Sequence, residues 1–158
     1  MNTGKIEWFD DTETAVSDKD GAGAATAAAK GGAPFSVEKL DKLPRVDILY
    51  AHANMSADLI DAAVKNGAKG LVIAGVGDGN MTQEALDRLT EAAKNGVAVV
   101  RSTRLPQGIV LRNNEVNDDK LGFVASGELT PPKARVLLQL SLTRTKDPAE
   151  IQKLFYAD

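Results

Sequence analysis

The glycine-rich stretch Gly75-Val76-Gly77-Asp78-Gly79-Asn80 is the segment whose residue types and place could serve ligand binding. It follows an apolar run typical of a buried strand and precedes a helical pattern. Open α/β sheets bind ligands at this carboxyl edge. As a dinucleotide fingerprint the stretch fails twice, because Asn80 replaces the third glycine and the next strand ends in Arg101 rather than an acid. A tight glycine turn without a ligand is the alternative reading.

Other polar residues could also do chemistry, but their local patterns do not demand it. Glu115 lies in residues 113–120, a polar stretch that by itself is typical of a solvated loop. The single histidine, His52, follows a strand directly, but no nucleophile is paired with it. Three hydroxyl residues fall at or near strand ends, where capping and turn hydrogen bonds account for Ser102, Thr103 and Ser126.

Composition limits the classes of function. The net charge of −3 gives no electrostatic reason to expect a nucleic acid or an anionic membrane as partner. No apolar run approaches the about 20 residues that a membrane span needs. The absence of cysteine excludes disulfides and thiolate chemistry. The first residues have neither the basic start nor the apolar stretch of a signal peptide, so the sequence as written predicts a cytoplasmic protein.

The elements that must position the polar residues follow an alternating pattern. Apolar, strand-like runs occur at residues 46–50, 70–74, 97–101 and 122–125. Helical patterns lie between and after them, and strands that alternate with helices imply a parallel sheet with right-handed crossovers. The sequence therefore predicts an α/β fold, a small three-layer sandwich around a four-stranded parallel sheet.

Local signals mark where the helices begin and end. Ser56, Thr82 and Thr130 are expected to be N-caps, and Asp147 opens a capping-box-like start. An Asn-Gly pair stops the first helix at residues 66–67 and the second at residues 95–96. In the first helix, the side chains expected to face inward are Leu59, Ile60, Ala63 and Val64.

The first 33 residues have a different character. Residues 1–9 contain a strand-like segment, Gly4 to Phe9. Residues 10–33 are polar and then rich in Ala and Gly, which bury little apolar area. We expect a flexible linker at residues 10–33 and the main α/β domain at residues 34–158.

Several blocks, in this order and at these intervals, resemble the C-terminal domain of bacterial type II L-asparaginases and glutaminase-asparaginases. Together they extend over about three quarters of the chain. The blocks are residues 43–50, 74–80, 98–104, 122–127, 133–140 and 143–148. By the same resemblance, residues 1–9 would be a remnant strand of the family's N-terminal domain.

The resemblance implies a role for two residues and a division of labour. In the family, the residues matching Asn80 and Glu115 reach into the active site of a neighbouring subunit and help to hold the amino-acid end of the substrate. A carboxylate opposite a substrate ammonium would give charge-assisted recognition. The family's catalytic threonines and lysine belong to its N-terminal domain, in segments like Thr-Gly-Gly-Thr and His-Gly-Thr-Asp-Thr, which these 158 residues do not contain.

The resemblance therefore predicts a domain that completes a substrate site, with no catalytic residue of its own and no cofactor or metal. The complete enzyme would hydrolyse L-asparagine, with L-glutamine as a further substrate, and would be a homo-oligomer. Its partners would be the N-terminal catalytic domain or a neighbouring subunit, and an exported full-length protein would be periplasmic. The rival hypothesis is a non-catalytic α/β module that binds a partner or a small molecule.

Overall fold

The computed structural model describes residues 35 and 40–156. The expected remnant strand at residues 1–9 and linker at residues 10–33 lie outside the described residues. Four parallel strands form one sheet in the order β1-β2-β3-β4. They are β1 (Val46–Tyr50), β2 (Gly70–Gly75), β3 (Ala98–Thr103) and β4 (Phe123–Ala125). The predicted parallel sheet is confirmed, and each strand lies within one or two residues of the expected range.

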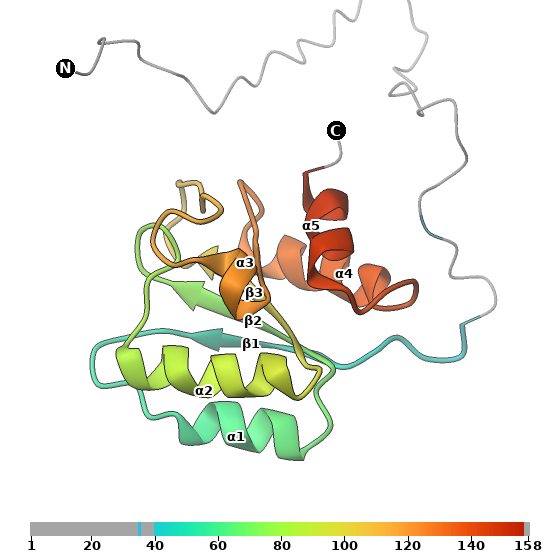
Figure 1. Cartoon of the computed structure of the whole chain (residues 1–158), viewed down its shortest axis with the longest axis horizontal. Helices are drawn as coiled ribbons and strands as arrows, with labels where there is room; N and C mark the ends of the chain where they lie inside the picture. Colours follow the sequence, from blue (N-terminus) through green and yellow to red (C-terminus); the bar gives the residue numbers. More distant parts are fainter. Residues whose placement is uncertain (1–34, 36–39, 157–158) are drawn as a thin grey trace, which may run out of the picture. The chain divides into compact units, whose positions relative to one another are not determined.

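One face of the sheet is covered by α1 (Asp58–Lys65) and α2 (Gln83–Lys94), as Figure 1 shows below the strands. The side chains that the two layers share are aliphatic or aromatic and are almost fully buried. They include Ile60, Leu71, Ile73, Leu89, Val99 and Phe123. Burial of such side chains contributes about 1.5–3 kcal/mol each and holds these two helices on the sheet.

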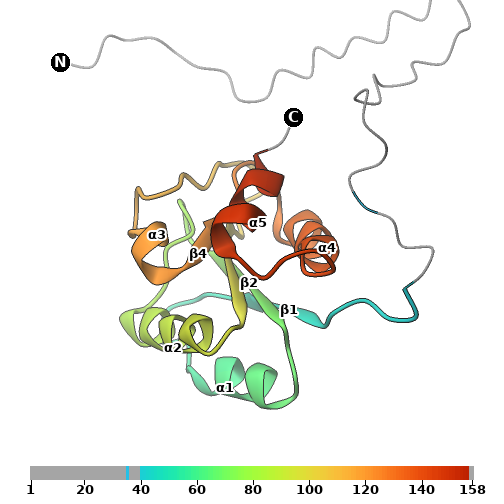
Figure 2. The same ribbon diagram turned by 45° about the vertical axis from the view of Figure 1, so that its right-hand side comes forward.

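The opposite face is covered by α4 (Pro131–Ser141) and α5 (Pro148–Phe155), which Figure 2 shows on the far side of the strands from α1 and α2. Val72, Val100 and Val124 of the sheet pack with Leu138 of α4 and Ile151 of α5. The short helix α3 (Asp118–Leu121) leads into β4. The three-layer α/β sandwich expected from the sequence is thereby confirmed.

The sequence predicted the N-cap positions of α2, α4 and α5 correctly, but not which side chains make capping hydrogen bonds. The Thr82 hydroxyl accepts from the Ala85 N–H at 3.3 Å, as expected. Asp147 accepts from the N–H groups of Ala149 and Glu150 at 2.7 and 3.0 Å. Thr130 occupies the N-cap position of α4, but its side chain makes no capping hydrogen bond. The expected cap residues were therefore correct in position, although only two of these three hydroxyl or carboxyl groups perform the capping.

The start of α1 differs from the expectation. Its N-cap is Ala57, not Ser56, and Ala57 has a helical backbone conformation. The Ser56 hydroxyl lies 3.4 Å from the Asp58 N–H, a long hydrogen bond. Leu59, expected to face inward, is 53% exposed, whereas the neighbouring Ile60 is fully buried. The reason is that α1 covers the edge strand β1, so its apolar stripe is narrow and only one of the two adjacent side chains reaches the sheet.

Helix side chains bind backbone groups at or beside both edges of the sheet. Gln152 of α5 accepts from the Ala125 N–H at 2.8 Å and donates to the Ala125 carbonyl at 3.0 Å, as a neighbouring strand would. At β1, Arg135 of α4 donates to the Val46 carbonyl at 2.8 Å, and Gln139 donates to the Pro44 carbonyl at 3.1 Å. Such contacts leave fewer free edge groups for strand pairing.

Candidate functional site

The segment Gly75–Asn80, here named the glycine turn, reverses the chain tightly at the carboxyl end of β2. Val76 and Asn80 exchange two backbone hydrogen bonds of 2.8 Å each, as across a hairpin. Gly77 and Gly79 between them have φ values of 56° and 73°, in the left-handed region that glycine adopts without steric cost. The turn thus presents Asn80 immediately before α2.

Glycine is also required in this turn because the chain passes close to itself. A Cβ added at Gly75 would lie 2.4 Å from the carbonyl carbon of Gly79. A Cβ at Gly79 would lie 3.1 Å from the Nη1 atom of Arg101. Gly75 and Gly79 therefore allow a compact turn that packs against Arg101. Their role differs from that of the glycines that bind a pyrophosphate in a dinucleotide fingerprint.

Asp78 in the middle of the glycine turn connects it to residues 111–117, here named the Glu115 loop. Its Oδ1 accepts from the Leu111 N–H at 2.7 Å. Its Oδ2 accepts from the Asn114 side-chain amide at 2.6 Å. Two segments more than 30 residues apart in sequence are thus joined through a single carboxylate.

Arg101 of β3 and Asp118 of α3 form a buried ion pair beneath both segments. The guanidinium Nε lies 2.7 Å from Oδ1 and Nη2 lies 2.8 Å from Oδ2, and both side chains are 0% exposed. Arg101 also donates to the carbonyls of Asp78 at 2.7 Å and of Leu111 at 3.0 Å. One arginine therefore anchors the glycine turn and the Glu115 loop to the sheet.

The Glu115 loop has further hydrogen bonds of its own near α3. The Asn113 N–H donates to Asp118 Oδ2 at 2.8 Å, and Asn113 itself has a φ of 58°. Asp119 accepts from the Asn113 amide at 2.8 Å and also pairs with Arg112. These contacts lower the pKa of the Asp119 carboxyl from its ordinary value. The hydrogen bond from the Asn113 side chain has the largest effect on this pKa, and the one from Arg112 the next largest. The loop is consequently well fixed on both sides of Glu115.

Asn80 and Glu115, the two residues expected to hold a substrate, are both exposed. The Asn80 Oδ1 accepts from the Met81 N–H at 2.7 Å, so its amide nitrogen is the group left to face a ligand. Glu115 makes no hydrogen bond or ion pair with any other residue of the described part of the chain. The two residues stand on segments that Asp78 and Arg101 bind together, which brings them onto one structural unit.

Asn80 also lines a shallow hollow of about 210 Å³ at the carboxyl end of β1 and β2. The other walls are formed by the segment after β1 and the start of α2: Ala51, His52, Ala53, Val76, Met81 and Thr82. His52 is exposed and its Nδ1 lies 2.8 Å from the Ala53 carbonyl oxygen. The structure thus places His52 in the same hollow as Asn80. The Thr82 hydroxyl also lines the hollow, and its oxygen accepts from the Ala85 N–H as the N-cap of α2.

The three hydroxyl residues at strand ends are only partly accounted for by turn hydrogen bonds. Ser102 donates to the Leu129 carbonyl at 2.9 Å, and Thr103 accepts from the Leu105 N–H at 3.2 Å, as expected. Ser126 was expected to behave in the same way, but its buried hydroxyl has no partner among the described residues.

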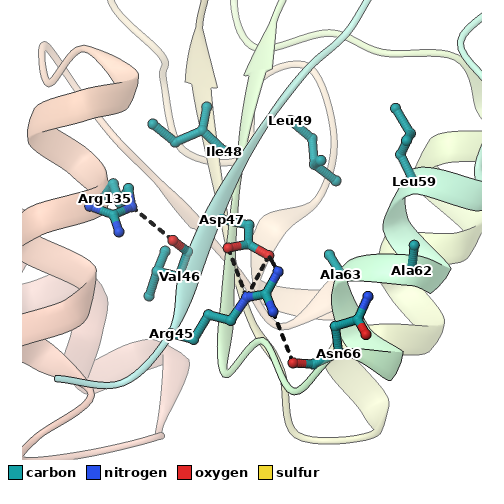
Figure 3. A pocket seen from close by; sticks show the side chains of 10 residues that line it. All are labelled: Arg45, Val46, Asp47, Ile48, Leu49, Leu59, Ala62, Ala63, Asn66 and Arg135. Atoms are coloured by element: carbon teal, nitrogen blue, oxygen red, sulfur yellow. Dashed lines mark hydrogen bonds and ion pairs between the residues drawn. The ribbon is translucent and has the colours of Figure 1, made fainter. Parts of the chain in front are cut away.

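A second hollow of about 470 Å³ lies along the edge strand β1 and α1 (Figure 3). Its charged side chains are already engaged in ion pairs or hydrogen bonds. Arg45 is paired with Asp47 at 2.8 Å and donates to the Asn66 carbonyl at 3.0 Å, and Arg135 donates to Val46. None of its lining residues belongs to the glycine turn or the Glu115 loop. This hollow is therefore separate from the candidate site.

Sequence patterns did not predict the residues that unite the site: Asp78, Arg101, Asn114 and Asp118. One signal was available, since a charged residue such as Arg101 directly after an apolar run is unusual in a buried strand and calls for a partner. The partner itself could not be named, because Asp118 lies in a polar stretch among several other carboxylates.

The fold and the site together define a parallel α/β domain that presents an amide and a carboxylate from two interlocked segments. In the part of the chain that the structure describes, no helix has the length and apolar character needed to cross a membrane. The family model of the glutaminase/asparaginase C-terminal domain matches residues 45–155. The chain belongs to the glutaminase/asparaginase family, as its C-terminal domain.

Relatives in several bacteria support this membership. Over 122 residues the chain is 57% identical to a probable periplasmic L-asparaginase of Haemophilus influenzae, a match that covers 77% of this chain and 35% of the relative. It is 55% identical to L-asparaginase 2 of Escherichia coli over the same shares. A glutaminase-asparaginase of Acinetobacter glutaminasificans is 42% identical over 77% of this chain and 38% of its own length. The chain thus spans little more than a third of these relatives.

Proposed function

We propose that this domain completes the substrate site of an L-asparaginase, which hydrolyses L-asparagine to L-aspartate and ammonia. L-Glutamine is the further substrate of this proposal, because some relatives are named glutaminase-asparaginases. Asn80 and Glu115 hold the amino-acid end of the substrate, and the hydrolytic groups come from an N-terminal domain. The proposal includes no cofactor and no metal.

The single observation that carries the proposal is the joining of the glycine turn to the Glu115 loop. Arg101 donates to one backbone carbonyl in each segment, of Asp78 and of Leu111. A site that must hold both the ammonium and the carboxylate of an α-amino acid needs its polar groups at fixed separation. Two segments clamped by one buried arginine meet that need, whereas two independent surface loops would not.

The chemistry of the two side chains suits an α-amino acid. The Glu115 carboxylate has no partner within the described residues, so it is available to a substrate ammonium. A hydrogen bond between charged groups contributes about 1.5–3 kcal/mol. The Asn80 amide nitrogen can donate to a carboxylate oxygen, and the hydrogen bond from the Met81 N–H to the Asn80 oxygen fixes the orientation of the amide. The domain thereby supplies recognition, not a nucleophile.

The rest of the active site is proposed to come from the family's N-terminal domain in a homo-oligomer, with Asn80 and Glu115 entering the site of a neighbouring subunit. A relative is named a periplasmic asparaginase. We extend the same location to the full-length protein. Residues 34–158 are proposed as the boundaries of the C-terminal domain.

The proposal is tested by ammonia release in a chimera. Residues 45–155 of this chain, the part that matches the family model, replace the corresponding residues of the Escherichia coli relative, to which the chain is 55% identical over 122 residues. We expect the chimera to release ammonia from L-asparagine and the 158-residue chain on its own to release none above a buffer blank. A folded chimera without activity, or an active isolated chain, would contradict the proposal.

A further inference from the structure

We propose that Asp78 is a positioning residue, whose carboxylate sets the place of Glu115 relative to Asn80. This inference rests on the proposed function and extends it to a residue that touches no substrate. Asp78 stands two positions before Asn80 within the glycine turn. Its two carboxylate oxygens accept from the Leu111 N–H at 2.7 Å and from the Asn114 amide at 2.6 Å.

The carboxylate can do this because the backbone of Asp78 is itself held. Its carbonyl accepts from Arg101 Nη1 at 2.7 Å, and the guanidinium is fixed by the buried Asp118. The glycines on either side have positive φ values, 56° and 73°, which glycine adopts without steric cost. Asp78 is therefore a short, anchored link between two segments, with one oxygen for each donor.

Glu115 depends on this link because it has no hydrogen bond or ion pair of its own within the described residues. Within the described residues, the side-chain amide of the neighbouring Asn114 makes one hydrogen bond, and its acceptor is Asp78. Loss of the Asp78 carboxylate frees Asn114 and the Leu111 N–H together. The loop then keeps the bond from the Asn113 N–H to Asp118 and the bond from Arg101 to the Leu111 carbonyl. It loses the two bonds that the Asp78 carboxylate accepts, from the Leu111 N–H and from the Asn114 amide next to Glu115.

The role of Asp78 differs from that of the buried ion pair. Asp78 is half-buried, so its substitution removes two hydrogen bonds without leaving a charge in the core. Asp78→Asn is the conservative variant, since its oxygen can accept from Leu111 while its amide pairs with a flipped Asn114 amide. Asp78→Ala removes both contacts. The two variants should therefore differ in loop order while both remain folded.

The first test uses the full 158-residue chain and amide hydrogen exchange. In Asp78→Ala we expect the Leu111 N–H to exchange at least about tenfold faster, because its acceptor is gone. Asp78→Asn should keep most of the protection. Asp87→Ala is the matched control, since Asp87 is an exposed carboxylate that accepts a side-chain bond at 2.7 Å on α2. Unchanged exchange of Leu111 in Asp78→Ala would overturn the inference.

The second test is a double-mutant cycle in the active chimera. Asp78→Ala should raise the KM for L-asparagine by about tenfold with kcat nearly unchanged, because a holding group is displaced in ground and transition states alike. In the Glu115→Gln background the same substitution should have an effect below about twofold. Asp78→Asn should restore most of the KM.

The outcomes separate the two proposals. If Glu115→Gln changes KM and Asp78→Ala does not, Asp78 is no positioning residue while the proposed function stands. If Asp78→Ala and Glu115→Gln add independently, Asp78 acts by another route and the inference is overturned. If neither substitution changes the kinetics of the active chimera, the proposed roles of Glu115 and Asp78 are both wrong.

Discussion

Arg101 and Asp118 are joined by two hydrogen bonds, of 2.7 and 2.8 Å, and neither side chain is exposed to solvent. The pair lies under the two segments that carry Asn80 and Glu115, and the arginine also binds one carbonyl in each of the segments. The anchor of the site is thus part of the core. Stability and site geometry should consequently depend on the same two residues.

Removal of one partner of this ion pair should destabilise the domain strongly. Arg101→Met leaves Asp118 buried without its cation, which typically costs about 3–5 kcal/mol. The free energy of unfolding from urea denaturation measures the loss. Arg88→Met is the control, since Arg88 forms exposed pairs with Asp61 and Glu91 and should change stability by at most about 1 kcal/mol. Equal costs for the two variants would show that the buried pair does not anchor the domain.

The glycine turn should not tolerate a side chain at Gly75. The added Cβ would meet the backbone of Gly79 at 2.4 Å, and backbone cannot move aside as a flexible side chain can. We expect Gly75→Ala to cost about 1–3 kcal/mol, the range for overpacking. Gly96→Ala tests positive φ alone, because its φ is 84° and no atom lies within 4 Å of the added Cβ. If Gly75→Ala is as stable as wild type in thermal unfolding, the turn is not as compact as described.

The two N-caps of α4 and α5 provide a matched comparison. Asp147→Ala removes an oxygen that accepts from two backbone N–H groups and should cost about 0.5–2 kcal/mol. Thr130→Ala removes a hydroxyl that makes no capping bond, so stability should hardly change. The midpoints of urea unfolding of the two variants, compared with that of the wild type, measure the two losses of stability. Equal costs for the two substitutions would show that the N-cap position, and not the capping hydrogen bond, determines the stabilisation.

The Asp119 carboxyl should titrate below its ordinary value of about 4. Its pKa is lowered first by the hydrogen bond from Asn113 and then by that from Arg112. Because the pKa is lower in the folded than in the unfolded protein, the Asp119 carboxylate stabilises the fold at pH values above its unfolded-state pKa. This stabilisation is lost as the pH falls through the folded-state pKa. Asn113→Gly removes the amide yet keeps the left-handed backbone, so the NMR titration midpoint of Asp119 should rise. A midpoint that does not move would exclude Asn113 as the cause.

The sheet could be predicted from the sequence because its strands are continuous apolar runs. Residues 70–74 and 97–101 needed no knowledge of tertiary contacts, since parallel buried strands have this composition. Helix detail was harder. Leu59 and Ile60 are equally apolar, and only the position of α1 over an edge strand decides that Leu59 is exposed.

The candidate site was half predictable. The composition of residues 75–80 predicted the glycine turn, and the resemblance to asparaginases indicated Asn80 and Glu115. The contacts of Asp78 with Leu111 and Asn114 join residues 33 and 36 positions apart. Periodicity and spacing report on local structure, so they carry no signal for such a link. Helix α3 was missed for a similar reason, because four residues are too few to show a helical period.

The most direct test of the account is the kcat/KM for L-asparagine of the active chimera with Glu115→Gln, compared with Glu91→Gln. Both residues are exposed glutamates, but Glu91 lies on α2 and pairs with Arg88. We expect Glu115→Gln to lower kcat/KM by about 10- to 150-fold, the equivalent of about 1.5–3 kcal/mol for a hydrogen bond to a charged group. Glu91→Gln should leave it unchanged within about twofold. Equal kcat/KM values in the two variants would contradict the claim that this domain holds the substrate through Glu115.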